Sequence, residues 1–271
     1  WKGAEAMTYG FIGLGNMASA ILRGMAKSGK FPAGTVYGYN RSPEKTARLA
    51  QETGLMPCVS ALETAQKADV IILAVKPQMM EGVLSAIAPA VTEEKLVISI
   101  AAGKPTSYYE AALGHVPVVR VMPNINARVL AATTAVCKGA YAGDGHLDIA
   151  MGLFETVGSV YALTEAQFPA FSAIGGASGA FIHLYIDALA SAGVQAGLPR
   201  TLAQDIACQT VLGSAKLTQE SGEHPVALMD QVCSPGGTTI EGVHTLKRLG
   251  FETAVQQAIR AIIEKDRRLA E

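Results

Sequence analysis

Two short glycine-rich segments carry the residue types best suited to binding anions. Residues 13–18 read Gly-Leu-Gly-Asn-Met-Ala, and residues 234–239 read Ser-Pro-Gly-Gly-Thr-Thr. In the second segment, adjacent glycines leave backbone N–H groups uncovered and two threonines add hydroxyls, which together suit a small carboxylate. The same Pro-Gly-Gly-Thr run is also typical of a tight turn that caps a helix. Taken alone, this segment leaves both interpretations open.

The first segment has the context of a dinucleotide-binding turn. It follows an apolar run at residues 9–12 and opens an amphipathic stretch at residues 16–28, so a strand, the glycines and a helix come in the required order. Gly13 permits the tight turn, Gly15 lets the backbone approach a pyrophosphate, and Ala18 keeps the helix close to the sheet. A glycine-rich turn without a ligand is the alternative, which the agreement of all three features disfavours.

The end of the second predicted strand favours NADP over NAD. Strand 35–39 is followed by Asn40, Arg41 and Ser42, and no carboxylate appears before Glu44. NAD-binding chains normally place an acid here to accept from the ribose hydroxyls, whereas a guanidinium and a hydroxyl suit a 2′-phosphate. The alternative is a surface arginine beside a helix cap. We predict that NADPH is preferred to NADH.

Two further strand ends are expected to complete the cofactor crevice. Residues 74–77 (Ala-Val-Lys-Pro) end the most apolar strand, residues 70–75, and residues 122–124 (Met-Pro-Asn) end another. In open α/β sheets the ligand crevice lies outside such carboxyl ends, so Lys76 and Asn124 are expected on its nicotinamide half. For Lys76 a solvated loop position is the alternative. The predicted cofactor-binding residues are Gly13, Gly15, Asn16, Met17, Ala18, Asn40, Arg41, Ser42, Ala74, Val75, Lys76, Pro77, Met122 and Asn124.

The order of the predicted elements divides the chain into two domains. Short apolar runs alternate with amphipathic stretches up to about Thr164, which predicts an α/β, Rossmann-type, doubly wound parallel sheet over residues 7–163. Within it, Ser42 is expected to be the N-cap of a helix. Beyond that point the patterns are helical, which predicts an all-α domain over residues 164–271. Its expected helices cover residues 165–194, 201–220, 239–249 and 253–269.

Composition limits the classes of partner. The 271 residues are 49% hydrophobic and 17% charged, with a formal net charge of −1, so nucleic acid is not an expected partner. The four cysteines are far apart, which argues against a disulfide framework or a metal site and fits a reducing, cytoplasmic location. The high apolar fraction favours a large interface between subunits.

The composition of residues 168–186 is compatible either with a membrane span or with a helix buried in protein. Residues 168–186 are apolar and nearly uncharged, which is compatible with a membrane span. They contain His183 and several Gly, Ala and Ser, and they lack flanking basic anchors. We therefore expect a closely packed buried helix, no membrane, and a homo-oligomer of at least two subunits.

Four segments together resemble pyrroline-5-carboxylate reductase over essentially the whole chain from Met7. The segments are residues 13–18, 74–77, 120–124 and 234–239. The last is the most specific, because Pro225 before it and Gly242, Val243 and Leu246 after it follow the family's spacing.

The resemblance implies an NAD(P)H-dependent oxidoreductase that transfers hydride to L-1-pyrroline-5-carboxylate and releases L-proline, the last step of proline biosynthesis. It implies an all-helical dimerisation domain, dimers that family members stack into decamers, and a substrate pocket drawn from both subunits. It assigns the substrate carboxylate to Ser234, Gly236, Gly237, Thr238 and Thr239, with Thr239 as the catalytic residue near the ring nitrogen. A cyclic imine protonates on its own, which agrees with the lack of an obvious acid–base pair.

Two other functions stay open at this level. A β-hydroxyacid dehydrogenase has a similar first segment, but its catalytic lysine lies on the first long helix of the second domain. In this chain the predicted second domain has no lysine before Lys216. A non-catalytic dinucleotide-sensing module would not need the second anion site at residues 234–239. Turnover of a cyclic imine distinguishes the reductase from both.

Overall fold

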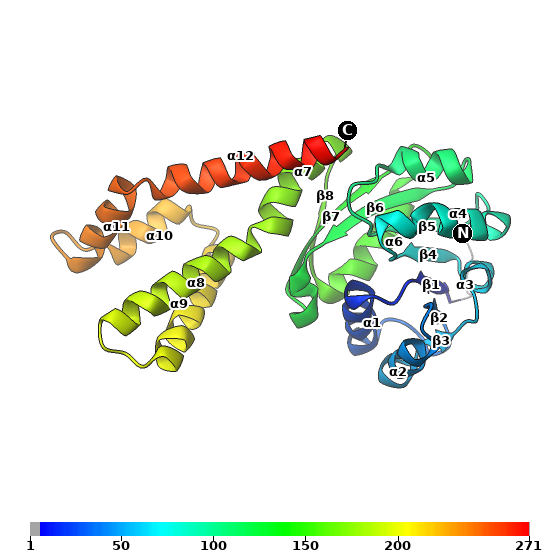
Figure 1. Ribbon diagram of the computed structural model, residues 1–271, viewed down its shortest axis with the longest axis horizontal. Helices are drawn as coiled ribbons and strands as arrows, with labels where there is room; N and C mark the ends of the chain where they lie inside the picture. The colour runs from blue at the N-terminus through cyan, green and yellow to red at the C-terminus, as the bar shows by residue number, and fades with distance from the viewer. Residues whose placement is uncertain (1–5, 271) are drawn as a thin grey trace. The chain divides into compact units, whose positions relative to one another are not determined.

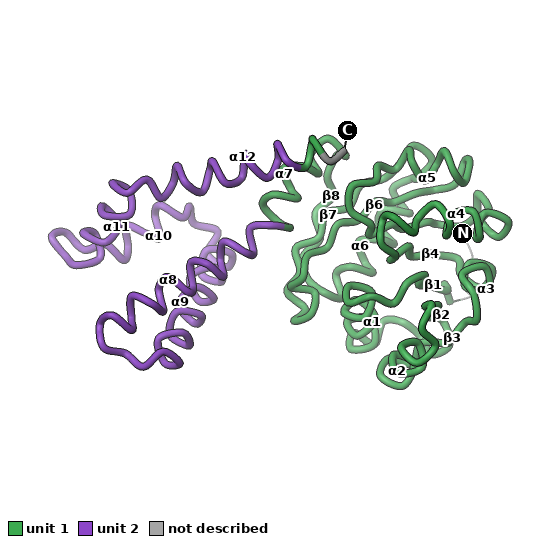
Figure 2. The backbone as a smooth tube through the Cα atoms, viewed as in Figure 1, with its two compact units in different colours: residues 1–176, 266–271 green, residues 177–265 purple. Residues whose placement is uncertain are grey.

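The computed structural model describes residues 6–270, with side chains through residue 268. The chain forms two compact units (Figure 2). The first runs up to Gly176 and takes in the C-terminal end from Asp266, and the second spans Ala177–Lys265.

The first unit is built on an eight-stranded sheet with the order β3-β2-β1-β4-β5-β6-β7-β8 (Figure 1). Its strands are β1 (Tyr9–Ile12), β2 (Val36–Tyr39), β3 (Met56–Pro57), β4 (Val70–Leu73), β5 (Leu96–Ser99), β6 (Val118–Pro123), β7 (Ala132–Lys138) and β8 (Gly158–Ala162). Its helices are α1 (Asn16–Ser28), α2 (Pro43–Thr53), α3 (Ala61–Lys67), α4 (Met80–Ile87), α5 (Thr106–Leu113), α6 (Asp144–Phe154) and α7 (Phe168–Phe171). The chain order reverses between β1 and β4, as in a doubly wound sheet.

Strand β4 shows why the sheet must be covered on both faces. All four of its residues are fully buried, and they alternate between two cores. Val70 and Ile72 pack into the core that includes α1 and α6, and Ile71 and Leu73 pack into the core that includes α3, α4 and α5. The continuous apolar run in the sequence is therefore a strand without a solvent face, as predicted.

The prediction of a wholly parallel sheet is wrong at one place. Strand β7 runs antiparallel to β6, while the remaining neighbours, β8 beside β7 included, are parallel. Only a short 3₁₀ segment (Ile125–Val129) lies between β6 and β7. A parallel crossover needs a dozen residues or more, so this short connection can only return antiparallel.

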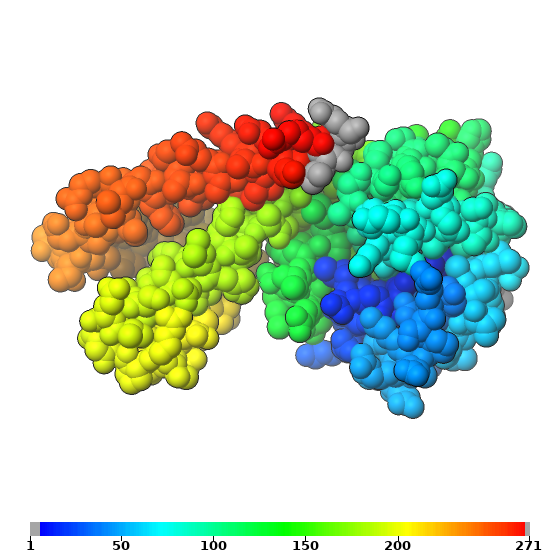
Figure 3. Space-filling model, in the orientation of Figure 1, coloured from blue at the N-terminus to red at the C-terminus, as the bar shows by residue number. Residues whose placement is uncertain are grey.

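The second unit is helical, with α8 (Gly179–Gln195), α9 (Arg200–Ser221), α10 (Pro225–Val232), α11 (Thr238–Arg248) and most of α12 (Phe251–Ala270). Helices α8 and α9 pack along one another through Ala190, Ala203 and Ala207, and Figure 3 shows their side chains in yellow-green and yellow as a continuous surface. The first of the predicted helices is interrupted, because residues 172–177 form a π-helix between α7 and α8.

The prediction that residues 168–186 form a buried helix does not hold within one chain. Ile174 is 64% exposed and Leu184 is 70% exposed. The stretch Glu165–Gln195 is long and apolar enough to cross a membrane by length and composition, a property it shares with core helices of soluble proteins. Small side chains bring α8 close to α9, but the rest of its apolar surface needs a cover from outside the chain.

Candidate functional site

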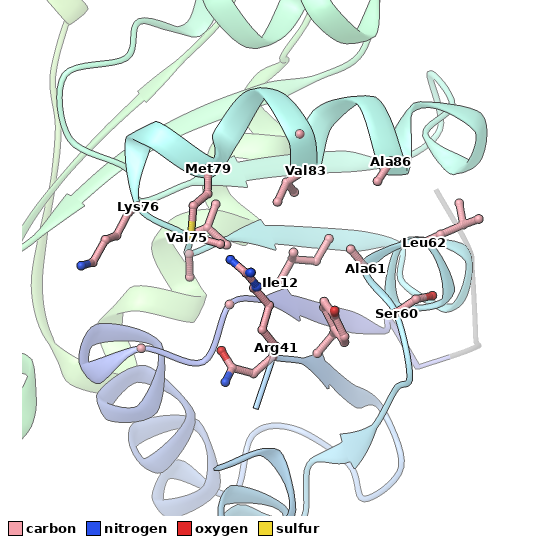
Figure 4. A pocket seen from close by; sticks show the side chains of 16 residues that line it. Ile12, Arg41, Ser60, Ala61, Leu62, Val75, Lys76, Met79, Val83 and Ala86 are labelled. Atoms are coloured by element: carbon pink, nitrogen blue, oxygen red, sulfur yellow. The ribbon is translucent and has the colours of Figure 1, made fainter. Parts of the chain in front are cut away.

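A cavity of about 480 Å³ opens at the carboxyl ends of β1, β2 and β4, where the strand order reverses (Figure 4). This is the place at which open α/β sheets bind ligands. Figure 4 shows Arg41 reaching into the cavity from the β2 side, with Met79 and Val83 on the opposite wall. Its lining residues are Ile12, Gly13, Gly15, Tyr39, Asn40, Arg41, Ser60, Ala61, Leu62, Ala74, Val75, Lys76, Met79, Gly82, Val83 and Ala86.

The two glycines of the first segment have different structural roles. Gly13 has φ of +93°, and a Cβ there would lie 2.8 Å from the carbonyl oxygen of Ala74 at the end of β4. Gly15 has an ordinary φ of −69°, and a Cβ there would meet nothing within 4 Å. Gly13 therefore lets two strand ends approach, whereas Gly15 keeps the mouth of the cavity open.

Helix α1 presents its amino end to this cavity. Gly15 is its N-cap, no side chain caps it, and its first turn contains no acidic residue. Its first N–H groups therefore lack intrahelical partners, and its dipole is unopposed there. Ala18 is only 1% exposed, which agrees with its predicted role of keeping the helix against the sheet. A pyrophosphate fits these groups, because they supply donors and positive potential without a side chain in the way.

Beside the end of β2, where an NAD-binding chain is expected to carry an acid, the cavity is lined by an amide and a guanidinium. Asn40 Oδ1 accepts a hydrogen bond from the backbone N–H of Leu14 at 3.2 Å, so the amide ties the end of β2 to the glycine turn. Arg41 lines the cavity and is exposed. Ser42 stands at the N-cap position of α2 as predicted, but its side chain makes no capping bond. Its hydroxyl is therefore not used by the helix.

The far wall of the cavity comes from Ser60, the start of α3 and α4, which none of the predicted motifs includes. Ser60 caps α3 by accepting from the Glu63 N–H at 3.0 Å, and Glu63 accepts from the Val59 N–H at 2.7 Å. The hydrogen bond from Lys67, followed by the one from the Val59 N–H, lowers the pKa of Glu63. The Ser-x-x-Glu spacing is a signal for a helix start, but it does not reveal that this helix end faces the glycine turn.

Of the other predicted cofactor residues, some line the cavity and some do not. Ala74, Val75 and Lys76 line the cavity, and Pro77 follows directly in a 3₁₀ turn. Asn16 is exposed in the first turn of α1, and Met17 packs partly against the core.

Met122 and Asn124 are not among the residues that line this cavity. Met122 packs against the small cluster around Phe168. Asn124 is only 9% exposed, and its side-chain amide is hydrogen-bonded within the protein.

The second glycine-rich segment forms a turn and a helix start in the helical unit. The N–H of Gly237 donates to the Ser234 carbonyl at 3.0 Å, and Gly236 has φ of +68°. Gly237 is the N-cap of α11, which begins at Thr238 and has no side-chain cap. The segment is therefore a helix-capping turn, and the first N–H groups of α11 have no side-chain cap. Its role as an anion-binding site stays a prediction. The Gly237 N–H itself is used to close the turn.

Within residues 6–270 no group of three or more His, Cys, Asp and Glu side chains is placed to hold a metal ion. All of the cysteines are free. His224 is the N-cap of α10 and accepts a hydrogen bond from the Val226 N–H at 3.2 Å.

Comparison with known proteins identifies the family. Residues 165–269 match the family described as pyrroline-5-carboxylate reductase dimerisation, and residues 8–103 match the one described as NADP oxidoreductase coenzyme F420-dependent. The pyrroline-5-carboxylate reductase of Escherichia coli K12 is 42% identical over 262 residues, covering 96% of this chain and 97% of the relative. The chain belongs to the pyrroline-5-carboxylate reductase family. The enzyme of Pisum sativum is 36% identical, with 98% of this chain and 97% of the relative covered.

Solved structures of the family have the same fold. The pyrroline-5-carboxylate reductase of Coxiella burnetii matches with a TM-score of 0.95 and 30% identity, covering 98% of this chain and all of that one. The pyrroline carboxylate reductase of Plasmodium falciparum, solved with NADP bound, matches with a TM-score of 0.86 and 30% identity over 99% of this chain and all of that one. The predicted fold class, a Rossmann-type sheet followed by a helical dimerisation domain, is confirmed.

Proposed function

We propose that this protein reduces L-1-pyrroline-5-carboxylate to L-proline with NAD(P)H, the last step of proline biosynthesis. The observation that carries the proposal is the open amino end of α1 behind Gly13 and Gly15, in a chain that matches reductases of this name along its whole length. A cofactor-binding unit and a separate small-anion turn are the two parts that such a reduction requires.

The chemistry asks little acid–base work of the protein. When bound, the cofactor supplies the hydride. Gly13, Gly15 and the α1 N–H groups hold its pyrophosphate, while Ala74 and Val75 border the crevice. In the helical unit, Ser234, Gly236, Thr238 and Thr239 bind the substrate carboxylate. Gly237 shapes this site, because its N–H closes the turn onto the Ser234 carbonyl. Thr239 lies near the ring nitrogen, where its hydroxyl orients an iminium that is already electrophilic.

We further propose that NADPH is preferred to NADH. Asn40 occupies the position of the ribose-binding acid, and its amide is committed to the Leu14 N–H. Arg41 borders the cavity, and the Ser42 hydroxyl is not used as a helix cap. A guanidinium and a free hydroxyl favour a 2′-phosphate over a diol.

Self-association completes the proposal. The match to the dimerisation family covers residues 165–269, which supports domain limits of 7–163 and 164–271 for cofactor binding and dimerisation. The compact units divide later in the chain, between Gly176 and Ala177. The exposed apolar side chains of α8 and α9, Leu184 and Leu212 among them, are surface that a second copy would cover. We propose a cytoplasmic homodimer, with such dimers stacked into a decamer as the higher assembly and neither nucleic acid nor membrane as a partner.

The direct test is oxidation of NADPH by the purified protein, followed at 340 nm with pyrroline-5-carboxylate as substrate. L-Proline should accumulate in equal amount to the NADPH consumed. Proline formation equal to background, in protein that binds NADPH, would refute the proposed activity. Light scattering at assay concentration tests the assembly, and an active monomer would contradict it.

A further inference from the structure

Asn124 lies where β6 ends and is nearly buried, with 9% of its surface exposed. Its Oδ1 accepts from the backbone N–H groups of Asn126 and Thr133, both at 3.2 Å. Its Nδ2 donates to the carbonyl oxygen of Gly175 at 2.7 Å. The side chain therefore joins three separate parts of the chain, and both of its polar ends are engaged.

The Gly175 carbonyl belongs to an unusual stretch of helix. Residues 172–177 are a π-helix, a rare form that often occurs at functional sites. A π-helix arises where a side chain or an extra residue disturbs the regular hydrogen-bond ladder. The division between the two compact units falls inside it, between Gly176 and Ala177.

The segment before this point is fixed to the Rossmann unit at its other end too. Glu165 accepts from the Thr106 N–H at 2.9 Å and from Arg120 at 3.1 Å. Arg120 in turn lies over the ring of Phe168, with its guanidinium carbon 4.4 Å from the ring centre. Residues 165–175 are thus held at the start by Glu165 and at the end by Asn124.

We propose that Asn124 is a positioning residue for the reduction, an inference that rests on the proposed function. Its bond to the Gly175 carbonyl fixes the last turn of the cofactor unit, from which the chain continues into the unit that carries residues 234–239. Hydride transfer is sensitive to displacements of about 1 Å between the reacting rings, so loss of this bond impairs the reaction without touching the cofactor.

Asn124→Asp tests this inference with little change in shape. The new carboxylate can still accept hydrogen bonds from the backbone N–H groups of Asn126 and Thr133. It cannot donate to the Gly175 carbonyl, because its second oxygen replaces the N–H donor with an acceptor. Asn126→Asp is the matched control, because it makes the same chemical change on an exposed neighbour. Asn124→Ser is the second variant, since its hydroxyl can still accept from Asn126 in a local turn but is too short to reach Gly175.

Three measurements decide the outcome. In both Asn124 variants kcat/KM for the imine should fall about tenfold or more, while the dissociation constant of NADPH stays within about twofold. The primary isotope effect with NADPH deuterated at the transferred position should rise, because hydride transfer becomes slower than the binding and release steps. Backbone hydrogen exchange across residues 172–180 should accelerate. The Asn126 control should match the wild type in all three.

Other results overturn the inference. An NADPH affinity that weakens in parallel with activity would make Asn124 a cofactor-binding residue. Lower activity with an unchanged isotope effect would mean only that less protein is active. A wild type without imine turnover refutes the proposed function. Unchanged backbone hydrogen exchange of residues 172–180 in Asn124→Asp refutes the role of the Asn124–Gly175 hydrogen bond.

Discussion

Gly13→Ala should lower the stability of the protein, whereas Gly15→Ala should weaken NADPH binding, although the two glycines are only two positions apart. At Gly13 the backbone has φ of +93°, and the new Cβ would lie 2.8 Å from the Ala74 carbonyl oxygen and 2.8 Å from Val75 Cγ1. A left-handed backbone costs an L-residue roughly 1–2 kcal/mol, and overpacking against a fixed backbone adds about 1–3 kcal/mol. We therefore expect Gly13→Ala to lower the free energy of unfolding by about 2–5 kcal/mol.

At Gly15 the backbone is ordinary and a Cβ meets nothing within 4 Å. Gly15→Ala should keep the free energy of unfolding within about 1 kcal/mol of the wild type. It should instead weaken NADPH binding about 10–100-fold, because the methyl group covers the approach to the α1 N–H groups and a hydrogen bond to a charged group is worth about 1.5–3 kcal/mol.

Urea unfolding followed by circular dichroism, at one fixed protein concentration, measures the first effect, and fluorescence titration with NADPH measures the second. With a urea slope of about 3 kcal/mol/M, the Gly13→Ala midpoint should fall by roughly 0.7–1.7 M with little change in slope. A Gly13→Ala protein as stable as the wild type would show that the ends of β1 and β4 do not approach as described. A Gly15→Ala protein with wild-type NADPH affinity would remove the pyrophosphate from the amino end of α1.

Three further predictions follow from the same residues and from the core. Arg41→Ala should lower kcat/KM with NADPH about tenfold and leave the value with NADH unchanged, whereas the control Arg48→Ala, on α2, should affect neither; parallel losses with both cofactors would refute the 2′-phosphate assignment. Thr239→Ala should lower kcat/KM for the imine up to about tenfold with NADPH affinity within about twofold, and unchanged imine turnover would remove this turn from the substrate site. Burial raises the pKa of the Cys137 thiol to about 12, so at pH 8 it stays protonated and should be alkylated only after unfolding; peptide mass spectrometry showing rapid labelling of the native protein would contradict this.

Local sequence was sufficient for the elements that carry a strong pattern. Strand β1 and helix α1 have the predicted limits of residues 9–12 and 16–28, and the glycine turn lies between them as expected. The fully buried β4 could also be predicted, because a strand covered on both faces is apolar at every position. The turn at residues 234–239 begins a helix as predicted, since Pro-Gly-Gly favours only a few backbone conformations.

Tertiary structure decided what depends on neighbours that are distant in the sequence. The antiparallel return of β7 follows from the length of one connection, and its apolar pattern is the same for either direction. The far wall of the cofactor cavity comes from Ser60 and from α4, whose distance from Gly13 along the chain gives no sign that they meet. Residues 168–186 have the composition of a buried helix, yet Ile174 and Leu184 remain largely exposed within one chain. Composition alone does not show which surface covers an apolar helix.

For Asn124, the sequence predicted the position in the fold but not the hydrogen-bond partners of the side chain. Its position after a strand end indicated that it lies near the carboxyl edge of the sheet, and it does. Which groups its amide meets was decided by folding, because the Gly175 carbonyl lies 51 residues away in sequence. The sequence by itself determined the class of ligand. Anion binding by backbone N–H groups requires glycines just before a helix start, and that spacing is visible in the sequence. The direction of each side chain was decided only by packing, because hydrogen-bond geometry depends on atoms that the fold brings together.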